Sequence, residues 1–373
     1  MNKTGFREIY NFDHNLPNGF SCQIGPFKIS ALPNTSKSEN IPRNERTIYR
    51  KTLDHEGSFK SSTHIEPAKI GKWMPTALVE DHPSLDAPSS LFPDIADGSY
   101  DLSLVLTFLT GLHVGVGNNV APYLPIQPGQ SIVSGSYFRG AHIDWALLPA
   151  LREAGGAESM MALSVAMTNS NALIKLAMGS SALDGIITKW HKKSGNTKYT
   201  PEVKKRITEA KIIFERELTN SGEDSELIKD IMARLSNLTS DSALTKLRQF
   251  LTTFDMFPKD ADPSALQRLK WMNTVRNAVA HTGAAPMDLA ESAETSIRVS
   301  TALSILLQFI CQVYIAKYLL KVDDMSQINQ TQNSILNFFS TGRFNGQDLL
   351  TEDFETFSAR MTSQWEEHGE YSS

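Results

Sequence analysis

The chain has 373 residues, of which 40% are hydrophobic and 21% are charged, and its net charge at neutral pH is −5. This composition excludes a disordered or collagen-like chain, and the length favours two domains that each bury a core. The negative net charge excludes a globally basic nucleic-acid binder, but not a local basic patch. The two cysteines form no CxxC motif, which argues against a disulfide framework and a cysteine-based zinc site and favours a reducing compartment.

Two stretches bear on location. The N-terminal sequence "MNKTGFREIYNFDHNLPNGF" lacks the apolar core and the cleavage site of a signal peptide. The most apolar segment, residues 299 to 320, is long enough to span a membrane, but it contains Gln308, Gln312 and Lys317. Because such groups are costly in lipid, we interpret it as a buried bundle helix. We therefore expect a cytoplasmic protein without a membrane partner.

The first 145 residues carry the pattern of β-strands separated by loops. Within 18–31, apolar and polar residues alternate on both sides of a Gly-Pro break, and period two is typical of strands. Segments rich in Pro, Ser, Asn and Asp, at 32–45 and 75–99, predict loops. "HVGVGN", at 113–118, is too short for a phosphate-binding glycine loop and predicts a strand and a turn. Strands are expected at 18–31, 46–53, 58–66, 100–111, 112–117 and 131–139.

After about residue 140, the spacing of apolar residues changes to three and four, which is typical of helices. Helices are expected at 143–154, 158–191 (interrupted near 169–171), 201–219, 223–237, 241–255, 263–282 and 287–321, and within 326–365. The sequence thus predicts an α+β protein. A β-rich sensing or recognition domain would occupy residues 1–145 and an α-helical bundle residues 146–325, followed by a helical, acidic segment at 326–373.

The expected helix at 263–282 has well-marked ends. Asp262 is a candidate N-cap, Pro263 stands at the first helical position, and Gly283 predicts the end of the helix. Arg276 and His281 therefore lie in the last turns. At 100° per residue they are about 140° apart, whereas Asn277 and His281 share a face.

An arginine followed after four to six residues by a histidine is a weak signal by itself. Composition predicts roughly one such match by chance, and two further matches occur, at Arg7 with His14 and at Arg50 with His55. Only Arg276 lies in an expected helix. Its long side chain can swing toward the face shared by Asn277 and His281, so three polar groups can converge there.

"RNAVAH", residues 276–281, stands before a glycine and a long apolar helix and resembles the motif of the HEPN superfamily. The stretch "NALIKLAMGSSALDGIITKW", 171–190, is similar to the family's early apolar helix with its small-Leu-acid triplet, here Ala182 to Asp184. The resemblance covers residues 150–325, and "LVLTFLTG" at 104–111 is similar to proteins with an ApeA-like HEPN domain. In many members glycine directly follows the histidine, whereas here Thr282 intervenes.

The resemblance implies a dimeric four- or five-helix bundle in which two motif copies form a metal-independent endoribonuclease site without a cofactor. Such cleavage uses the ribose 2′-hydroxyl as nucleophile and leaves a 2′,3′-cyclic phosphate and a 5′-hydroxyl. His281 suits proton transfer because imidazole titrates near neutrality. Arg276 suits binding of phosphate oxygens, and Asn277 would position the histidine or a phosphate.

Within 186–216, nine basic residues stand against three acidic ones, whereas the tail from Gln347 is acidic. This basic segment predicts contacts with RNA, or alternatively a solvated helix face. The candidate RNA-binding residues are Lys189, Lys192, Lys193, Lys204, Lys205 and Arg206. By family analogy, the expected partners are tRNA or mRNA, a second copy of the chain, and a phage or antitoxin protein, in an anti-phage defence or toxin-like system.

Two alternatives stay open. In one, Arg276 pairs with a neighbouring acid and His281 caps its own helix, within a non-catalytic dimeric scaffold that has a ligand-sensing β domain. In the other, the β domain is an ordinary metabolic enzyme. The sequence has no GxSxG elbow, Walker A loop or metal-ligand histidine spacing to support the second.

Overall fold

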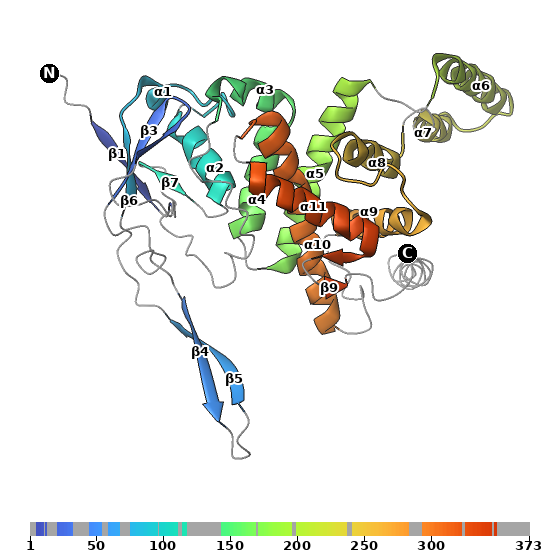
Figure 1. Cartoon of the computed structure of the whole chain (residues 1–373). Helices are drawn as coiled ribbons and strands as arrows, with labels where there is room; N and C mark the ends of the chain where they lie inside the picture. Colours follow the sequence, from blue (N-terminus) through green and yellow to red (C-terminus); the bar gives the residue numbers. More distant parts are fainter. Residues whose placement is uncertain are drawn as a thin grey trace.

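The fold is α+β, as predicted, with a small antiparallel sheet at one end of the molecule and a helical bundle beside it (Figure 1). The computed structural model describes residues 5–10, 12, 21–32, 45–53, 59–67, 75–95, 97–110, 114–117, 143–168, 171–195, 199–236, 241–282, 293–322, 325–344 and 347–348. The predicted strand at 131–139, the expected stop at Gly283 and the tail beyond Asp348 lie outside these residues.

The sheet has five strands in the order β2-β3-β6-β1-β7, and all neighbouring pairs are antiparallel. The strands are β1 (Phe6–Tyr10), β2 (Ser21–Ile24), β3 (Phe27–Ala31), β6 (Pro75–Glu80) and β7 (Gly115–Val116). β2 and β3 bury every second residue, which confirms the strands predicted within 18–31. A separate hairpin pairs β4 (Glu45–Leu53) with β5 (Phe59–Pro67), and both of these strands were predicted.

Two strands of the sheet were missed. β6 falls in the predicted loop 75–99 and begins with Pro75, which is compatible with the first position of a strand. β1 shows little alternation because only Ile9 is fully buried in it. The loop prediction was also wrong for helix α1 (Pro83–Asp86).

The strand predicted at 100–111 is wrong, because Ser99–Thr110 forms helix α2. Every residue of α2 except Tyr100 is buried, so the helix has no polar face to give a period of 3.6. A continuous apolar run of this kind is compatible with either a buried strand or a buried helix. α2 packs against β7 and against helix α4 (Gly156–Thr168) and so joins the sheet to the bundle.

The remaining helices follow the predictions closely. They are α3 (Leu148–Glu153) after a short 3₁₀ turn η2 (Trp145–Leu147), α5 (Ala172–Ser194), α6 (Pro201–Asn220), α7 (Ser225–Ser236), α8 (Ala243–Thr253), α9 (Pro263–Thr282), α10 (Ala293–Val313), the π-helical η4 (Tyr314–Leu319) and α11 (Met325–Thr341). A last short pair, β8 (Arg343–Phe344) with β9 (Gln347–Asp348), was not predicted. The predicted interruption of 158–191 is confirmed, since α4 ends at Thr168 and Asn171 caps α5.

α5 and α10 form the centre of the bundle and pack extensively on each other. Gly179 of α5 lies where they approach closely, because a Cβ built on it would stand 3.5 Å from Cβ of Leu307. By length and composition, Val299–Leu319 is a helix that could cross a membrane, and 83% of its most apolar window is buried inside the protein. The predicted buried bundle helix at 299–320 is thus confirmed as a core helix of the described fold.

The buried hydrophobic side chains form one cluster that reaches from Ile9 of the sheet to Phe344 after α11. The predicted boundary between residues 145 and 146 falls inside η2, whose Trp145 packs edge-on against Phe27 with ring centroids 5.0 Å apart. Gly25 in the β2–β3 turn has φ of 55°, and a Cβ there would stand 2.6 Å from Trp145. This turn therefore requires glycine for both conformation and space.

Candidate functional site

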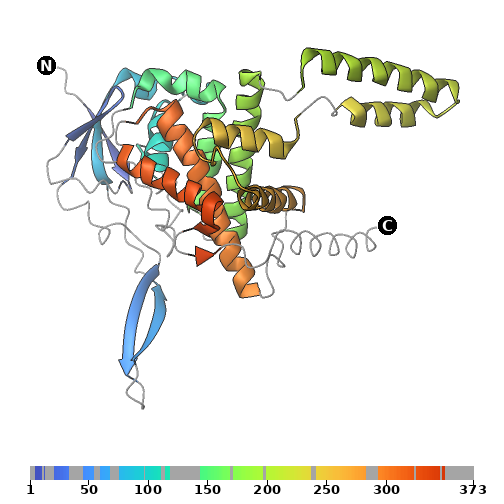
Figure 2. The same ribbon diagram turned by 45° about the vertical axis from the view of Figure 1, so that its right-hand side comes forward.

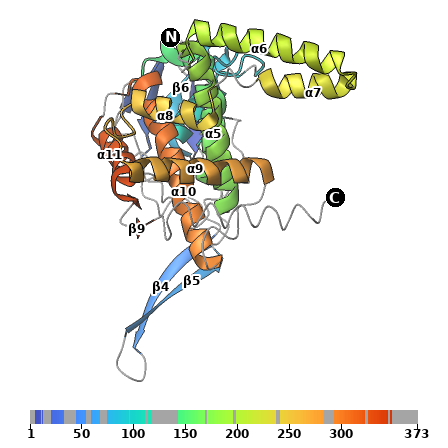
Figure 3. The ribbon, with the colours of Figure 1, turned by 90° about the vertical axis from the view of Figure 1, so that its right-hand side faces the viewer.

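Helix α9 carries the three residues that the sequence singled out. Its start is as predicted, because the backbone N–H of Ala265 donates to Oδ1 of Asp262 at 2.6 Å and Pro263 opens the helix. The helix continues through Thr282, so Arg276, Asn277 and His281 all belong to it. Figure 3 shows α9 crossing α5, against which it packs. The side chain of His281 lies outside the described part of the structure.

Arg276 is buried, with only 2% of its side chain exposed. Its Nη1 stands 2.8 Å from Oδ1 of Asp184 on α5, and this carboxylate side chain is 47% exposed. The last residue of the small-Leu-acid triplet therefore contacts the first residue of the Arg-His motif. The alternative in which Arg276 pairs with an acid is confirmed for Arg276, and a capping role of His281 stays a prediction.

The guanidinium of Arg276 uses only part of its hydrogen-bonding capacity. Nη2 donates to Oδ1 of Asn273 at 3.0 Å, one turn earlier on α9. Neither Nε nor Nη1 makes an aligned hydrogen bond with a described residue, so the close contact with Asp184 is an ion pair without hydrogen-bond geometry. Buried donors of this kind normally have an acceptor, so the guanidinium can donate to a further acceptor.

Burial lowers the pKa of Arg276 from its ordinary value, and the Asp184 carboxylate acts in the opposite direction. The guanidinium nevertheless stays protonated, because an arginine is charged throughout the accessible pH range. Cys311 of α10 lies in the same environment, and its burial raises the pKa of its thiol. Among the residues near Arg276, the site thus combines one fixed positive charge and one half-exposed carboxylate.

Asn277 is half-buried and follows Arg276 directly on α9. It shares a helical face with His281, since the two are four residues apart. That the side chains of Arg276, Asn277 and His281 converge stays a prediction. Asn273 and Asp184 were missing from the predicted site. The signal for Asn273 was its spacing of three from Arg276 on one helix, which makes the two side chains neighbours.

The six candidate RNA-binding residues do not gather at Arg276. Lys189 of α5 pairs with Glu158 of α4 at 2.8 Å, while Lys192 and Lys193 are exposed in the last turn of α5. The other three lie on α6, which with α7 forms a helical hairpin projecting from the bundle (Figure 2). They are Lys204, Lys205 and Arg206.

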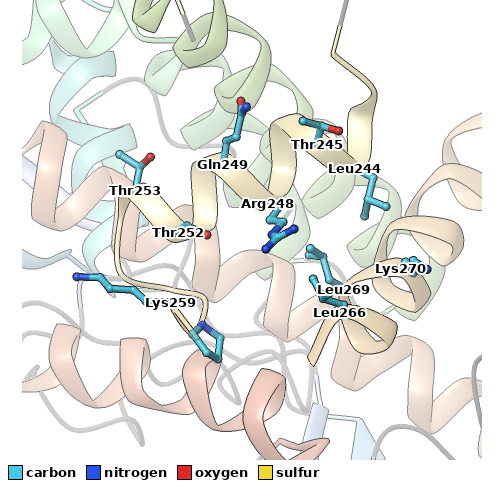
Figure 4. Close-up of a pocket in the computed structure, with 11 residues that line it drawn as sticks. Leu244, Thr245, Arg248, Gln249, Thr252, Thr253, Lys259, Leu266, Leu269 and Lys270 are labelled. Atoms are coloured by element: carbon cyan, nitrogen blue, oxygen red, sulfur yellow. The ribbon is translucent and has the colours of Figure 1, made fainter. Parts of the chain in front are cut away.

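A second feature, not predicted from the sequence, is an open hollow of about 620 Å³ between α8 and the first half of α9 (Figure 4). It contains three cationic side chains and no carboxylate in its lining. The lining residues are Leu244, Thr245, Arg248, Gln249, Thr252, Thr253, Pro258, Lys259, Leu266, Leu269 and Lys270. Lys259 already pairs with Asp255 at 3.4 Å. Figure 4 shows Arg248 directed toward Leu266 and Leu269, so the cations do not converge on one point.

Among the described residues, no group of three or more His, Cys, Asp or Glu side chains could hold a metal ion. No protein-family model, curated protein or solved structure matches the chain.

Proposed function

We propose that the chain is a metal-independent endoribonuclease of the HEPN type, acting on tRNA or mRNA in the cytoplasm as part of a defence or toxin-like system. One observation carries the proposal. The two stretches that resemble the family, 171–190 and 276–281, are far apart in sequence, yet Asp184 and Arg276 stand 2.8 Å from each other. The contact brings the two stretches that resemble the family together in space, which supports the proposal.

In the proposal, His281 accepts the proton of the 2′-hydroxyl and donates a proton to the 5′-oxygen that leaves. Imidazole suits both steps because its unperturbed pKa lies near neutrality. A second copy of the chain supplies the second histidine. The exposed Lys192 and Lys193 guide the RNA by charge.

The role of Arg276 differs from the one expected from sequence. Its side chain is 2% exposed and faces Asp184 and Asn273, so it fixes the end of α9 against α5 in the described arrangement. Arg276 is then a positioning residue for His281. Direct contact with phosphate would require Asp184 to release the guanidinium, and the unused Nε and Nη1 donors would suit such an acceptor.

The test is incubation of the purified full chain with total tRNA in EDTA. The wild-type protein should cleave, and His281→Ala should lose at least about a hundredfold in rate, the usual contribution of a general acid or base. His82→Ala is the matched control, because His82 caps α1 in the sheet region. If His281→Ala folds and cleaves as fast as the wild type, the site is misassigned.

A second candidate function is a non-catalytic scaffold, and the burial of Arg276 favours it. The tRNA assay of the wild-type chain separates the two candidates. The double variant Arg276→Met/Asp184→Leu then tests the positioning role of Arg276, since replacing both partners of an ion pair by apolar groups preserves packing. A scaffold keeps its fold and oligomeric state in this variant and shows no cleavage with or without the substitutions. In a nuclease, the double variant should cleave more slowly than the wild type, because Arg276 no longer positions His281.

A further inference from the structure

The α6–α7 hairpin leaves large apolar side chains exposed. No residue of α6 is buried, although the helix has 20 residues. Ile212, Ile213 and Phe214 are 52%, 57% and 43% exposed, and Leu227 of α7 is 46% exposed. Single exposed apolar residues are ordinary, whereas several large ones on one short helical hairpin indicate an interaction surface.

The exposed residues of α6 include a face distinct from the one that α7 covers. Ile207, Lys211 and Leu218 are half-buried and fall on one side of the helix, where α7 packs. At 100° per residue, six exposed residues share a sector about 100° wide on the adjoining side. They are Val203, Arg206, Ala210, Ile213, Phe214 and Glu217. We call this sector the α6 outer face.

The α6 outer face has opposite charges at its two ends. Its apolar centre, Ala210, Ile213 and Phe214, is preceded by Arg206 and followed by Glu217. Among the described residues, neither Arg206 nor Glu217 has an ion-pair partner. The surroundings reinforce this polarity, since Lys204 and Lys205 flank the first end. Around the hairpin tip, from 215 to 226, five acidic residues stand against one basic residue.

We propose that the α6 outer face binds the same face of a second copy of this chain, with the two α6 helices antiparallel. A two-fold axis near residue 211 or 212 places Arg206 of one copy opposite Glu217 of the other, and the same pair forms again on the other side. The apolar centres then meet at the axis, and the two hairpins form a four-helix bundle.

The α6 outer face is complementary to itself, which favours a second copy of the chain as its partner. An arbitrary partner would need its own matching pattern, whereas an antiparallel copy supplies an acid for each base and an apolar centre for each apolar centre. The hairpin also projects from the bundle, which leaves room for a second hairpin to lie along it (Figure 2). The inference gives Arg206 a protein partner in place of the RNA contact expected from sequence, and it does not depend on the proposed nuclease.

The first test measures the mass of the full chain in solution by light scattering or analytical ultracentrifugation over a range of concentrations. Ile213→Glu should raise the dissociation constant at least about tenfold, because it places a charge in the apolar centre of each copy. Ile174→Glu is the matched control, since Ile174 is 40% exposed on α5, outside the hairpin. Circular dichroism should show unchanged helicity in both variants.

The second test uses charge reversal to check the antiparallel register. Arg206→Glu and Glu217→Arg should each weaken association several-fold, because each creates two like-charge contacts in a two-fold dimer. The double variant Arg206→Glu/Glu217→Arg should restore association. A wild-type chain that stays monomeric, an Ile213→Glu variant that associates like the wild type, or a double variant that stays weak would each overturn the proposal.

Discussion

At the Arg276–Asp184 pair, a buried cation depends on one carboxylate for its charge compensation. Asp184→Asn should therefore lower the free energy of unfolding by about 1–3 kcal/mol, less than a fully buried pair loses, because Asp184 is 47% exposed. Urea unfolding followed by circular dichroism measures the change. Glu158→Gln is the control, because the exposed Lys189–Glu158 pair should contribute below about 1 kcal/mol. Equal losses in both variants would contradict the special role of Asp184.

Lys175 is a second buried cation, with 8% exposure, and desolvation lowers the pKa of its ammonium group. A lowered pKa means that the folded state disfavours the charged form. The protein therefore loses stability as the pH falls from the ordinary pKa of about 10.4 through the folded pKa, and regains it as the pH rises again. Lys175→Met should stabilise the protein by roughly 1–2 kcal/mol near pH 7. The advantage should shrink near about pH 10.

Urea unfolding at the two pH values tests this prediction. Lys192→Met on the same helix is the control, since Lys192 is exposed. A gain for Lys175→Met that stays constant with pH would show that packing, and not the buried charge, determines the effect.

The sequence located Arg276, Asn277 and His281 on one helix, because the caps and the apolar spacing of 263–282 are strong local signals. It did not predict the burial of Arg276, although the signal was present. Arg276 is seven residues after the buried Leu269, so it continues the apolar stripe of α9. The contact with Asp184 depends on how α5 and α9 cross, which no local pattern specifies.

Among the elements, α5 and α10 pack against each other at Gly179. A Cβ at this position would stand 3.5–3.9 Å from atoms of Leu307, Ser304 and Gln308, which is ordinary contact. Gly179→Ala should therefore stabilise α5 by about 0.5–1 kcal/mol through helix propensity. Gly179→Leu should destabilise by about 1–3 kcal/mol or more, because its longer side chain has no space between the helices.

Thermal unfolding of the two Gly179 variants checks this prediction. Ser181→Leu serves as the control for the larger substitution, since Ser181 is exposed on the same helix and should change stability by less than about 0.5 kcal/mol. If Gly179→Leu unfolds at the temperature of the wild type, then α5 and α10 are not in the described contact.

The errors in predicting elements have one physical origin. Helices with one apolar and one polar side, such as α7 and α8, were predicted within a few residues of their observed ends. α2 was predicted as a strand because burial on all sides removes the periodicity. β1 was missed for the opposite reason, since most of its side chains are exposed or half-buried.

For the molecule as a whole, the described structure joins the sheet and the bundle through one hydrophobic core. The change in apolar spacing near residue 140 predicted the α+β class correctly, but the chain's length alone could not reveal this shared core. Packing contacts run from the sheet through α2 and α4 to α5, which carries Asp184. The proposal requires two copies of α9 in one site, so activity should depend on assembly.

The chemistry of the cut ends tests the proposed function most directly. The wild-type chain, in EDTA, should leave a 2′,3′-cyclic phosphate and a 5′-hydroxyl, and an RNA with a single 2′-deoxy nucleotide at the cleaved position should stay intact there. Mass spectrometry of the fragments distinguishes these ends from others. Three results would contradict the proposal that His281 assists attack by the ribose 2′-hydroxyl. They are fragments with a 5′-phosphate and a 3′-hydroxyl, cleavage of the 2′-deoxy substrate, and intact RNA at all protein concentrations.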